Sequence, residues 1–199
     1  MPRPKRLFSP DMAYHIISRG NNRQPLFRQS HDFDLYLEFL GSLKKEYSYQ
    51  LYHYCLMTNH VHLLMRFHTF HAFQKVPQRL NLLYAKHVHR AYGHVGHVFQ
   101  DRFKSLPVTD NTYLLECGRY IERNPLQAGL VDQPEDYRWS SHAFYRLGRP
   151  NPLITSNPMV LDLAHSEEQR KVLYGVYVST DRPYDHVVEK ALLGKLRFL

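Results

Sequence analysis

The segment QLYHYCLMTNHVHLLMRF, residues 50–67, decides how this chain folds. Two apolar runs rich in strand-forming residues, 50–57 and 60–67, are separated by only the turn residues Thr58 and Asn59. Two such runs joined by a two-residue turn predict a β-hairpin.

Two titratable rings, His60 and His62, stand inside the apolar run that follows the turn. Residues two apart in a strand project to the same face, so His60 and His62 point together and Val61 points away. Neutral imidazole nitrogens are suitable metal ligands near pH 7, and two on one face can share a cation. A strand can also carry two histidines that face solvent or bond to the backbone, so the pair alone does not establish a metal site.

The segments on either side of the hairpin alternate between strand and helix patterns. The hydrophobic periodicity predicts strands at residues 13–18 and 98–108 and helices at residues 30–47 and 79–92. A third helix, capped by Thr109 or Asp110, should stop near Asn124, because the α region is disfavoured for a residue before proline. This order predicts an α+β domain, with a mainly antiparallel sheet and helices packed on one face, of ferredoxin-like or RRM-like type.

The region after about residue 150 has a different pattern. It is rich in proline, and Ser166 followed by Gln169 forms a capping box that predicts the start of a helix. A last helix is expected at about residues 184–196. We therefore divide the chain into a domain over residues 1–150 and a C-terminal helical extension over residues 151–199.

The composition favours a polyanionic partner. The chain has 26 Lys and Arg residues against 18 Asp and Glu, a formal net charge of +8, which suits nucleic acid first and an anionic membrane surface second. Long apolar runs that could span a membrane are absent, and the charged start MPRPKR does not resemble a secretory signal. Cys55 and Cys117 are expected to be free, buried thiols in a reducing cytoplasm.

The predicted third helix carries the stretch YLLECGRYIERNP, which ends at Pro125. At about 100° per residue, Tyr113, Tyr120 and Asn124 fall on one side of it. A tyrosine oxygen can attack a phosphodiester and form a covalent phosphotyrosine, and a divalent metal, Mg or Mn, offsets the weak nucleophilicity of a phenol. The two histidines and the amide oxygen of Asn124 would hold that metal. Tyr113 rivals Tyr120 as the nucleophile, and a C-cap explains Asn124 equally well.

Four segments together resemble a known family. YHIISRGNNRQPLF, YCLMTNHVHLLM, GHVFQDRFKS and RYIERNPLQAGLV, in this order, are similar to segments of the REP-associated tyrosine transposases, which belong to the HUH single-tyrosine transposase superfamily. The similarity runs from about residue 13 to residue 145. It departs from the family pattern at Thr58, where Pro is common, and at Gln127, where Arg is common.

The resemblance implies roles for particular residues. His60 and His62 would form the HUH motif, Tyr120 would be the nucleophile and Asn124 the third metal ligand. The protein would have the HUH fold. It would cleave single-stranded or hairpin DNA at palindromic REP-like elements, leaving a 5′-phosphotyrosine and a free 3′-OH before strand transfer. The enzyme would be bacterial and nucleoid-associated, and a monomer or a homodimer. The alternatives are a binder that holds hairpin DNA without cutting it, an RRM-like RNA binder, and a metal hydrolase without a covalent intermediate.

Basic and polar side chains on several elements are candidates for DNA contact, because cations on one face of an element suit a phosphate backbone. The candidates are Arg19, Asn22 and Arg23 after the first strand, Arg79, Lys86 and Arg90 on the second helix, Gln100, Arg102 and Lys104 on the strand predicted at 98–108, and Arg119 and Arg123 beside Tyr120. Each of these residues is equally well explained as an ordinary solvated side chain. His15, on the first strand, is expected to be a core histidine.

Overall fold

The protein is described by a computed structural model covering residues 8–180. Its centre is an antiparallel sheet of four strands in the order β2-β3-β1-β4. The strands are β1 (Ala13–Arg19), β2 (Tyr49–Met57), β3 (His60–Phe67) and β4 (Lys104–Val108). β2 and β3 form the predicted hairpin, in which Met57 pairs with His60 across the two-residue turn.

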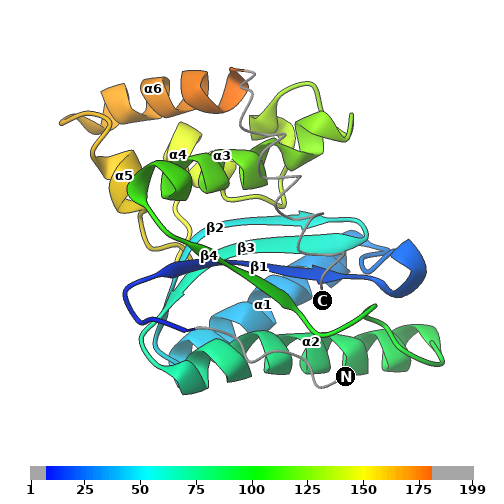
Figure 1. The fold of residues 1–199 in the computed structure, drawn as a ribbon. Coiled ribbons are helices and arrows are strands. Elements are labelled where there is room, and N and C mark those ends of the chain that lie inside the picture. The colour runs from blue at the N-terminus through cyan, green and yellow to red at the C-terminus, as the bar shows by residue number, and fades with distance from the viewer. Residues whose placement is uncertain (1–7, 181–199) are drawn as a thin grey trace.

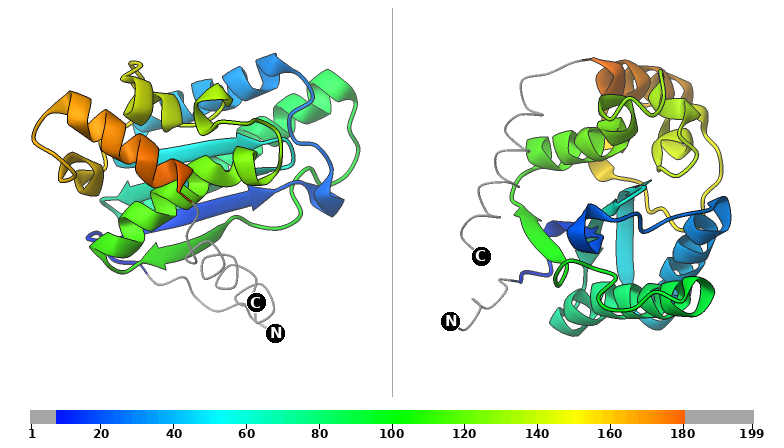
Figure 2. Two further views of the ribbon diagram at one scale, coloured as in Figure 1. Left: turned by 90° about the horizontal axis from the view of Figure 1, so that it is seen from above. Right: turned by 90° about the vertical axis from the view of Figure 1, so that its right-hand side faces the viewer.

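Helices cover both faces of the sheet (Figure 1). Seen from the side, the sheet lies between two helical layers (Figure 2). One layer contains α1 (Ser30–Glu46) and α2 (Phe70–Tyr92). The other contains α3 (Asn111–Gln127), α4 (His142–Leu147), α5 (Pro158–Leu161) and α6 (Glu167–Ser179). Two short 3-10 turns, η1 (Asn21–Arg23) and η2 (Pro134–Asp136), follow β1 and α3.

Strand alternation builds two hydrophobic cores. On β3, Leu63 and Met65 belong to the core under α1 and α2, whereas Leu64 belongs to the core under α3. On β1, Tyr14 points to the first of these cores and Ala13 to the second. The α+β class and the antiparallel sheet are confirmed. The prediction that the helices pack on one face was wrong, because a sheet with two apolar faces needs a helical layer on each.

One irregularity interrupts β2. The pairing register shifts between Leu51 and His53, so Tyr52 is an extra residue opposite β3. Leu51 joins the core under α1 and α2, whereas Tyr52 joins the core under α3 and His53 contacts Glu122 of α3. This bulge therefore directs two consecutive side chains to the α3 face.

Several elements differ in length from the sequence prediction. α2 begins at Phe70, well before residue 79, and includes Pro77, because its buried apolar stripe continues on both sides of the proline. Gly93 ends α2 in the left-handed conformation, as expected. The strand predicted at 98–108 was too long. Only its second half is β4, and the first half is a loop with an isolated bridge between Phe99 and Gly20.

Residues 151–180 pack against α3, α4 and β2. The backbone N–H of Thr155 donates to the carbonyl of Leu51 at 2.8 Å. Ser166 caps α6 by accepting from the N–H of Gln169, as predicted. The helix predicted at 184–196 lies outside the described residues, and the boundary near residue 150 stays a prediction.

Two further expectations concern cysteines and membrane spans. Cys55 and Cys117 are both free and buried, as predicted. Within residues 8–180, no helix combines the length and the hydrophobicity that crossing a membrane requires.

Candidate active site

The structure brings the proposed nucleophile and the histidine pair together on the α3-facing side of the sheet. The ring centroids of His60 and His62 on β3 are 4.8 Å apart. The Tyr120 ring, on α3, lies 5.8 Å from the His62 ring and 6.1 Å from the His15 ring, and it is 6% exposed. Strand parity thus predicted the shared face of the histidines correctly.

β1 supplies the neighbours of the histidine pair. Arg19 stands opposite His60 in the sheet, and Ile17 stands opposite His62. His15 is fully buried, as expected of a core histidine, but its Nε2 also lies 2.8 Å from Nδ1 of His62. This contact depends on the register between β1 and β3, which the sequence alone did not provide.

Both ligand candidates use Nδ1 for a hydrogen bond, which leaves Nε2 as the nitrogen that could bind a metal. Nδ1 of His60 donates to Oδ1 of Asn59 at 2.7 Å, which leaves Nε2 of His60 with a lone pair in the neutral ring. Nδ1 of His62 is occupied by His15, and its buried Nε2 has no partner among the described residues. In the tautomer where His62 donates from Nδ1, its Nε2 also keeps a lone pair.

The surroundings keep the imidazoles uncharged. Burial and, less strongly, the charge of Arg19 lower the pKa of His60 to about 4, although a hydrogen bond to Asn124 opposes the shift. Burial, reinforced by His60, lowers the pKa of His15 to about 3. Burial also lowers the pKa of His62 well below its ordinary value, with smaller contributions from His60, His15 and Arg19. All three rings are therefore neutral near pH 7, the state in which imidazole binds metals.

Asn124 is held by the helix that it belongs to. Its Nδ2 donates to the carbonyl of Tyr120 at 2.6 Å and approaches the carbonyl of Ile121 at 3.4 Å. Pro125 has no N–H for the Ile121 carbonyl, so the amide of Asn124 replaces part of the missing bond. The helix consequently continues to Gln127, and the prediction that it stops at Asn124 was wrong. Since the C-cap is Ala128, the C-cap explanation of Asn124 is also wrong.

These residues fit a divalent cation. Two neutral imidazoles, each with an Nε2 lone pair, and one amide side chain in contact with His60 form a mixed nitrogen and oxygen donor set, which Mn²⁺ and Mg²⁺ accept to different degrees. Within residues 8–180, no group of three or more His, Cys, Asp or Glu side chains is arranged to hold a metal ion. A cation at this site would therefore depend on His60, His62 and Asn124.

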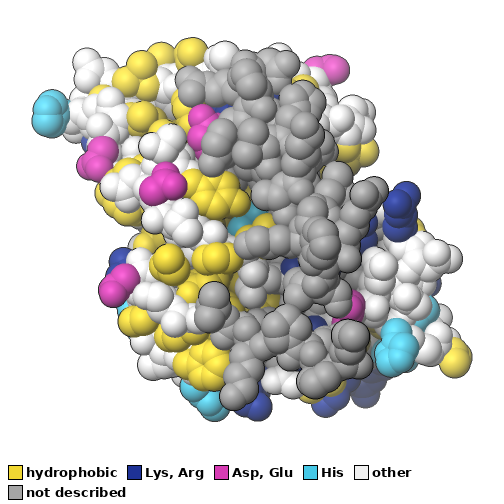
Figure 3. Space-filling view, in the orientation of Figure 1, with side chains coloured by type: hydrophobic (Ala, Val, Ile, Leu, Met, Phe, Trp, Pro, Cys, Tyr) yellow, Lys and Arg dark blue, Asp and Glu magenta, His cyan; other side chains and the backbone are white. Residues whose placement is uncertain are grey.

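Six of the predicted DNA contacts lie on or beside β1 and β4. Lys104 pairs with Ile17 across β4 and β1, and the exposed Arg19 ends β1. The exposed loop residues on either side of them are Asn22, Arg23, Gln100 and Arg102. The sequence predicted that Gln100 and Arg102 lie with Lys104 on one strand, but both residues lie in the loop that precedes β4. Lys and Arg side chains are visible on the right-hand side of the space-filling view, where the loop after β1 lies (Figures 1 and 3).

The loop after β1 is joined to the hairpin turn. The N–H of Gly20 donates to the carbonyl of Asn59 at 2.8 Å, and the N–H of Leu26 donates to the carbonyl of Thr58 at 2.8 Å. Asn22 and Arg23 both adopt left-handed conformations, with φ of 48° and 58°. Such conformations cost free energy in residues other than glycine, and they often occur where a side chain has to be presented.

The other candidate DNA contacts are elsewhere. Arg79, Lys86 and Arg90 lie on α2, across the sheet from Tyr120, and Arg79 binds Glu46 and Tyr47. The guanidinium groups of Arg119 and Arg123 are buried against the end of α6. Arg119 and Arg123 were predicted as DNA contacts beside Tyr120, but their side chains pack against α6 instead, because the helix packs on both the sheet and α6.

Comparison with known proteins agrees with this geometry. The family model described as IS200-like transposase matches residues 8–124. Among solved structures, the chain is similar to that of a REP-associated tyrosine transposase bound to a REP hairpin, with a TM-score of 0.60, 16% identity, and coverage of 79% of this chain and 92% of that chain. No curated protein matches the sequence. The structural likeness establishes the fold, and the family match, over more than half of the chain, establishes that this protein belongs to the IS200-like transposase family.

Proposed function

We propose that the protein is a metal-dependent endonuclease and strand transferase that acts on single-stranded or hairpin DNA through a 5′-phosphotyrosine. The observation that carries the proposal is the placement of the Tyr120 ring 5.8 Å from His62, whose buried Nε2 has no partner among the described residues. Membership of a transposase family and the fold of a neighbour bound to a REP hairpin support the choice of DNA as the substrate.

Tyr120 would carry the chemistry. Its oxygen would attack the phosphorus and lose its proton, and the bond from phosphorus to the 3′-oxygen would break as that oxygen gains a proton. In the second step, a 3′-OH would attack the same phosphorus and release Tyr120. His60, His62 and Asn124 would hold Mg²⁺ or Mn²⁺, which would supply charge neutralisation at the scissile phosphate.

The residues around the site would bind the DNA backbone. Arg19 and Lys104 belong to adjacent strands next to the histidine pair and would face the phosphates beside the scissile bond. Asn22 and Arg23 lie in the loop that is hydrogen-bonded to the hairpin turn, and they would contact the nucleotides next to those phosphates. Affinity should therefore fall steeply as the salt concentration rises.

A covalent-trapping gel tests the proposal. The protein is mixed with end-labelled hairpin DNA and Mn²⁺ and then denatured, with Tyr120→Phe and Tyr113→Phe run beside it. We expect a slow band that carries the label on the 3′ side of the cut and disappears only in Tyr120→Phe. Loss only in Tyr113→Phe would move the nucleophile, and cleavage without a covalent band would indicate a hydrolase.

A second candidate function is the binding of hairpin DNA without cleavage. The low exposure of Tyr120, 6%, favours it, because an in-line attack needs the phosphate to reach the phenol oxygen. Tight hairpin binding with no cleavage by the wild-type protein, on a hairpin that its family relatives cut, would establish this second function.

A further inference from the structure

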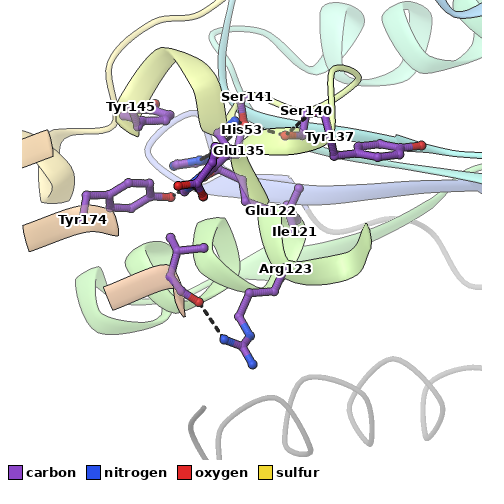
Figure 4. A network of polar contacts seen from close by, with 12 residues as sticks. His53, Ile121, Glu122, Arg123, Glu135, Tyr137, Ser140, Ser141, Tyr145 and Tyr174 are labelled. Carbon is purple, nitrogen blue, oxygen red and sulfur yellow. Dashed lines mark hydrogen bonds and ion pairs between the residues drawn. The ribbon is translucent and has the colours of Figure 1, made fainter. Parts of the chain in front are cut away.

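Glu122 lies on α3 between Tyr120 and Asn124, but it points away from the histidine pair. Its side chain is fully buried and accepts four hydrogen bonds, as the close-up shows in part (Figure 4). The donors are Nδ1 of His53 at 2.8 Å, Oγ of Ser141 at 2.5 Å, Nδ1 of His142 at 2.9 Å and the hydroxyl of Tyr174 at 3.0 Å. A buried carboxylate with this many donors is held in one position.

The four donors belong to three different parts of the fold. His53 is on β2, at the bulge, Ser141 and His142 are at the start of α4, and Tyr174 is on α6. The network extends further, because Nδ2 of Asn157 donates to Nε2 of His53 at 3.0 Å. Through this one carboxylate, α3 is joined both to the sheet and to the C-terminal helices.

A second set of contacts fixes α3 to the end of α6. Arg123 donates from Nη1 to the carbonyls of Val178 and Ser179, each at 2.8 Å. Arg119 donates from Nη1 to the carbonyl of Thr180 at 3.2 Å and from Nε to Glu116 at 3.0 Å. These charged side chains are buried, so separating α3 from α6 would leave charges without their partners.

The hydrogen bonds around Glu122 also fix the tautomer of His53. Because Nε2 of His53 accepts from Asn157, the hydrogen-bond pattern assigns the proton of that ring to Nδ1, where it faces Glu122.

The site is sensitive to small rotations of α3. The phenol oxygen of a helical tyrosine is roughly 9 Å from the helix axis, so a rotation by about 10° moves it by about 1.5 Å. A misplacement of about 1 Å can lower the rate of a reaction by on the order of 10²-fold. A group on the opposite side of the same helix is therefore well placed to control where Tyr120 sits.

We propose that Glu122 is a positioning residue, through which α4 and α6 hold α3 in the orientation that places Tyr120 and Asn124 beside the histidine pair. This inference rests on the proposed function and assigns a role to the C-terminal extension. It makes α4 and α6 part of the catalytic apparatus although they carry no residue that contacts the reacting atoms.

A matched pair of tyrosine variants tests the proposal. Tyr174→Phe removes one hydroxyl that donates to Glu122, and Tyr49→Phe removes one buried hydroxyl that donates to the carbonyl of Leu40, on the other face of the sheet. We compare single-turnover formation of the Tyr120 adduct, hairpin affinity and melting temperature, at a temperature where all variants are folded. We expect adduct formation to fall about 10-fold or more in Tyr174→Phe only, with hairpin affinity changed less than about two-fold. Equal rates in the two variants would overturn the proposal.

A second readout does not require cleavage. The nuclear Overhauser effect between the ring protons of Tyr120 and His62 reports their proximity directly, since the ring centroids are 5.8 Å apart. We expect it to weaken in Tyr174→Phe and in Glu122→Gln and to persist in Tyr49→Phe. If it persists in folded Glu122→Gln, the positioning role is refuted. If it weakens while the wild-type protein forms no adduct, the positioning role stands and the proposed function fails.

Discussion

Nε2 of His15 lies 2.8 Å from Nδ1 of His62, in a fully buried contact between adjacent strands. The contact fixes the orientation of the His62 ring and leaves its Nε2 directed into the site without a partner among the described residues. Partners of this kind orient metal-binding histidines and select their tautomer.

Replacing His15 should weaken the metal site without removing a ligand. His15→Leu removes the acceptor for Nδ1 of His62, and we expect the affinity for Mn²⁺, measured by titration calorimetry, to fall about 10- to 100-fold. His15→Gln offers an amide oxygen in place of Nε2 and should recover part of this loss. Equal Mn²⁺ affinity in wild-type protein and His15→Leu would show that His15 is only a core residue.

Gly118→Ala should destabilise the protein. A Cβ there would lie 2.6 Å from Nε2 of His53, a ring that is fully buried and stacked on Tyr145 at 4.5 Å. Because neither ring has room to move, we expect the free energy of unfolding to fall by about 1–3 kcal/mol in urea denaturation.

Gly41→Ala is the control for this change. It is also a helical glycine, but its Cβ would meet only the end of the Leu153 side chain, at 3.1 Å. The gain in helix propensity, about 0.5–1 kcal/mol, should offset that contact. A loss in Gly41→Ala as large as that in Gly118→Ala would contradict the steric explanation.

Two substitutions at Arg23 separate loop strain from DNA contact. Arg23→Gly and Arg23→Ala both remove the cation, and each should weaken hairpin binding. The slope of log affinity against log salt concentration should fall by the amount that corresponds to about one phosphate contact. Only Arg23→Gly relieves the left-handed conformation, with φ of 58°, and it should be more stable than Arg23→Ala by about 1 kcal/mol. Fluorescence anisotropy over a salt series and thermal unfolding measure the two effects, and unchanged anisotropy would remove Arg23 from the DNA interface.

Asp32 should make stability depend on pH. Burial opposes ionisation, but hydrogen bonds from His87, Tyr92 and the N–H groups of Arg28 and Gln29 outweigh burial and lower the pKa of the Asp32 carboxyl from 3.8. A lowered pKa means that the unfolded chain binds the proton more readily, so the contribution is complete above pH 3.8 and is lost as the pH falls below that value.

The variant Asp32→Asn tests this prediction. The difference in the free energy of unfolding between wild-type protein and Asp32→Asn should be constant from pH 7 to about pH 5 and should shrink at more acidic pH. Urea titrations at several pH values measure it. A difference that does not change with pH would show that the carboxylate charge contributes nothing.

The sequence predicted those features that depend on local periodicity. Strand parity placed His60 and His62 on one face, and the two-residue turn predicted the hairpin. Local patterns failed where packing decides: Pro77 hid the first part of α2, and the apolar residues Val98 and Phe99 suggested a strand where the structure has a loop. Contacts between distant segments, such as those of Glu122, were missed because no local pattern encodes them.

The bulge in β2 has a consequence for how this sequence tolerates change. Deleting Tyr52 would restore regular alternation along the strand. Leu51 already pairs with Met65 and His53 with Leu64, so without the residue between them Leu51 would still face α1 and α2 and His53 would still face α3. Homologues with a gap at position 52 should therefore keep the rest of the strand in register and lose only what Tyr52 itself contributes, its side chain in the core under α3 and the carbonyl that accepts from Tyr145.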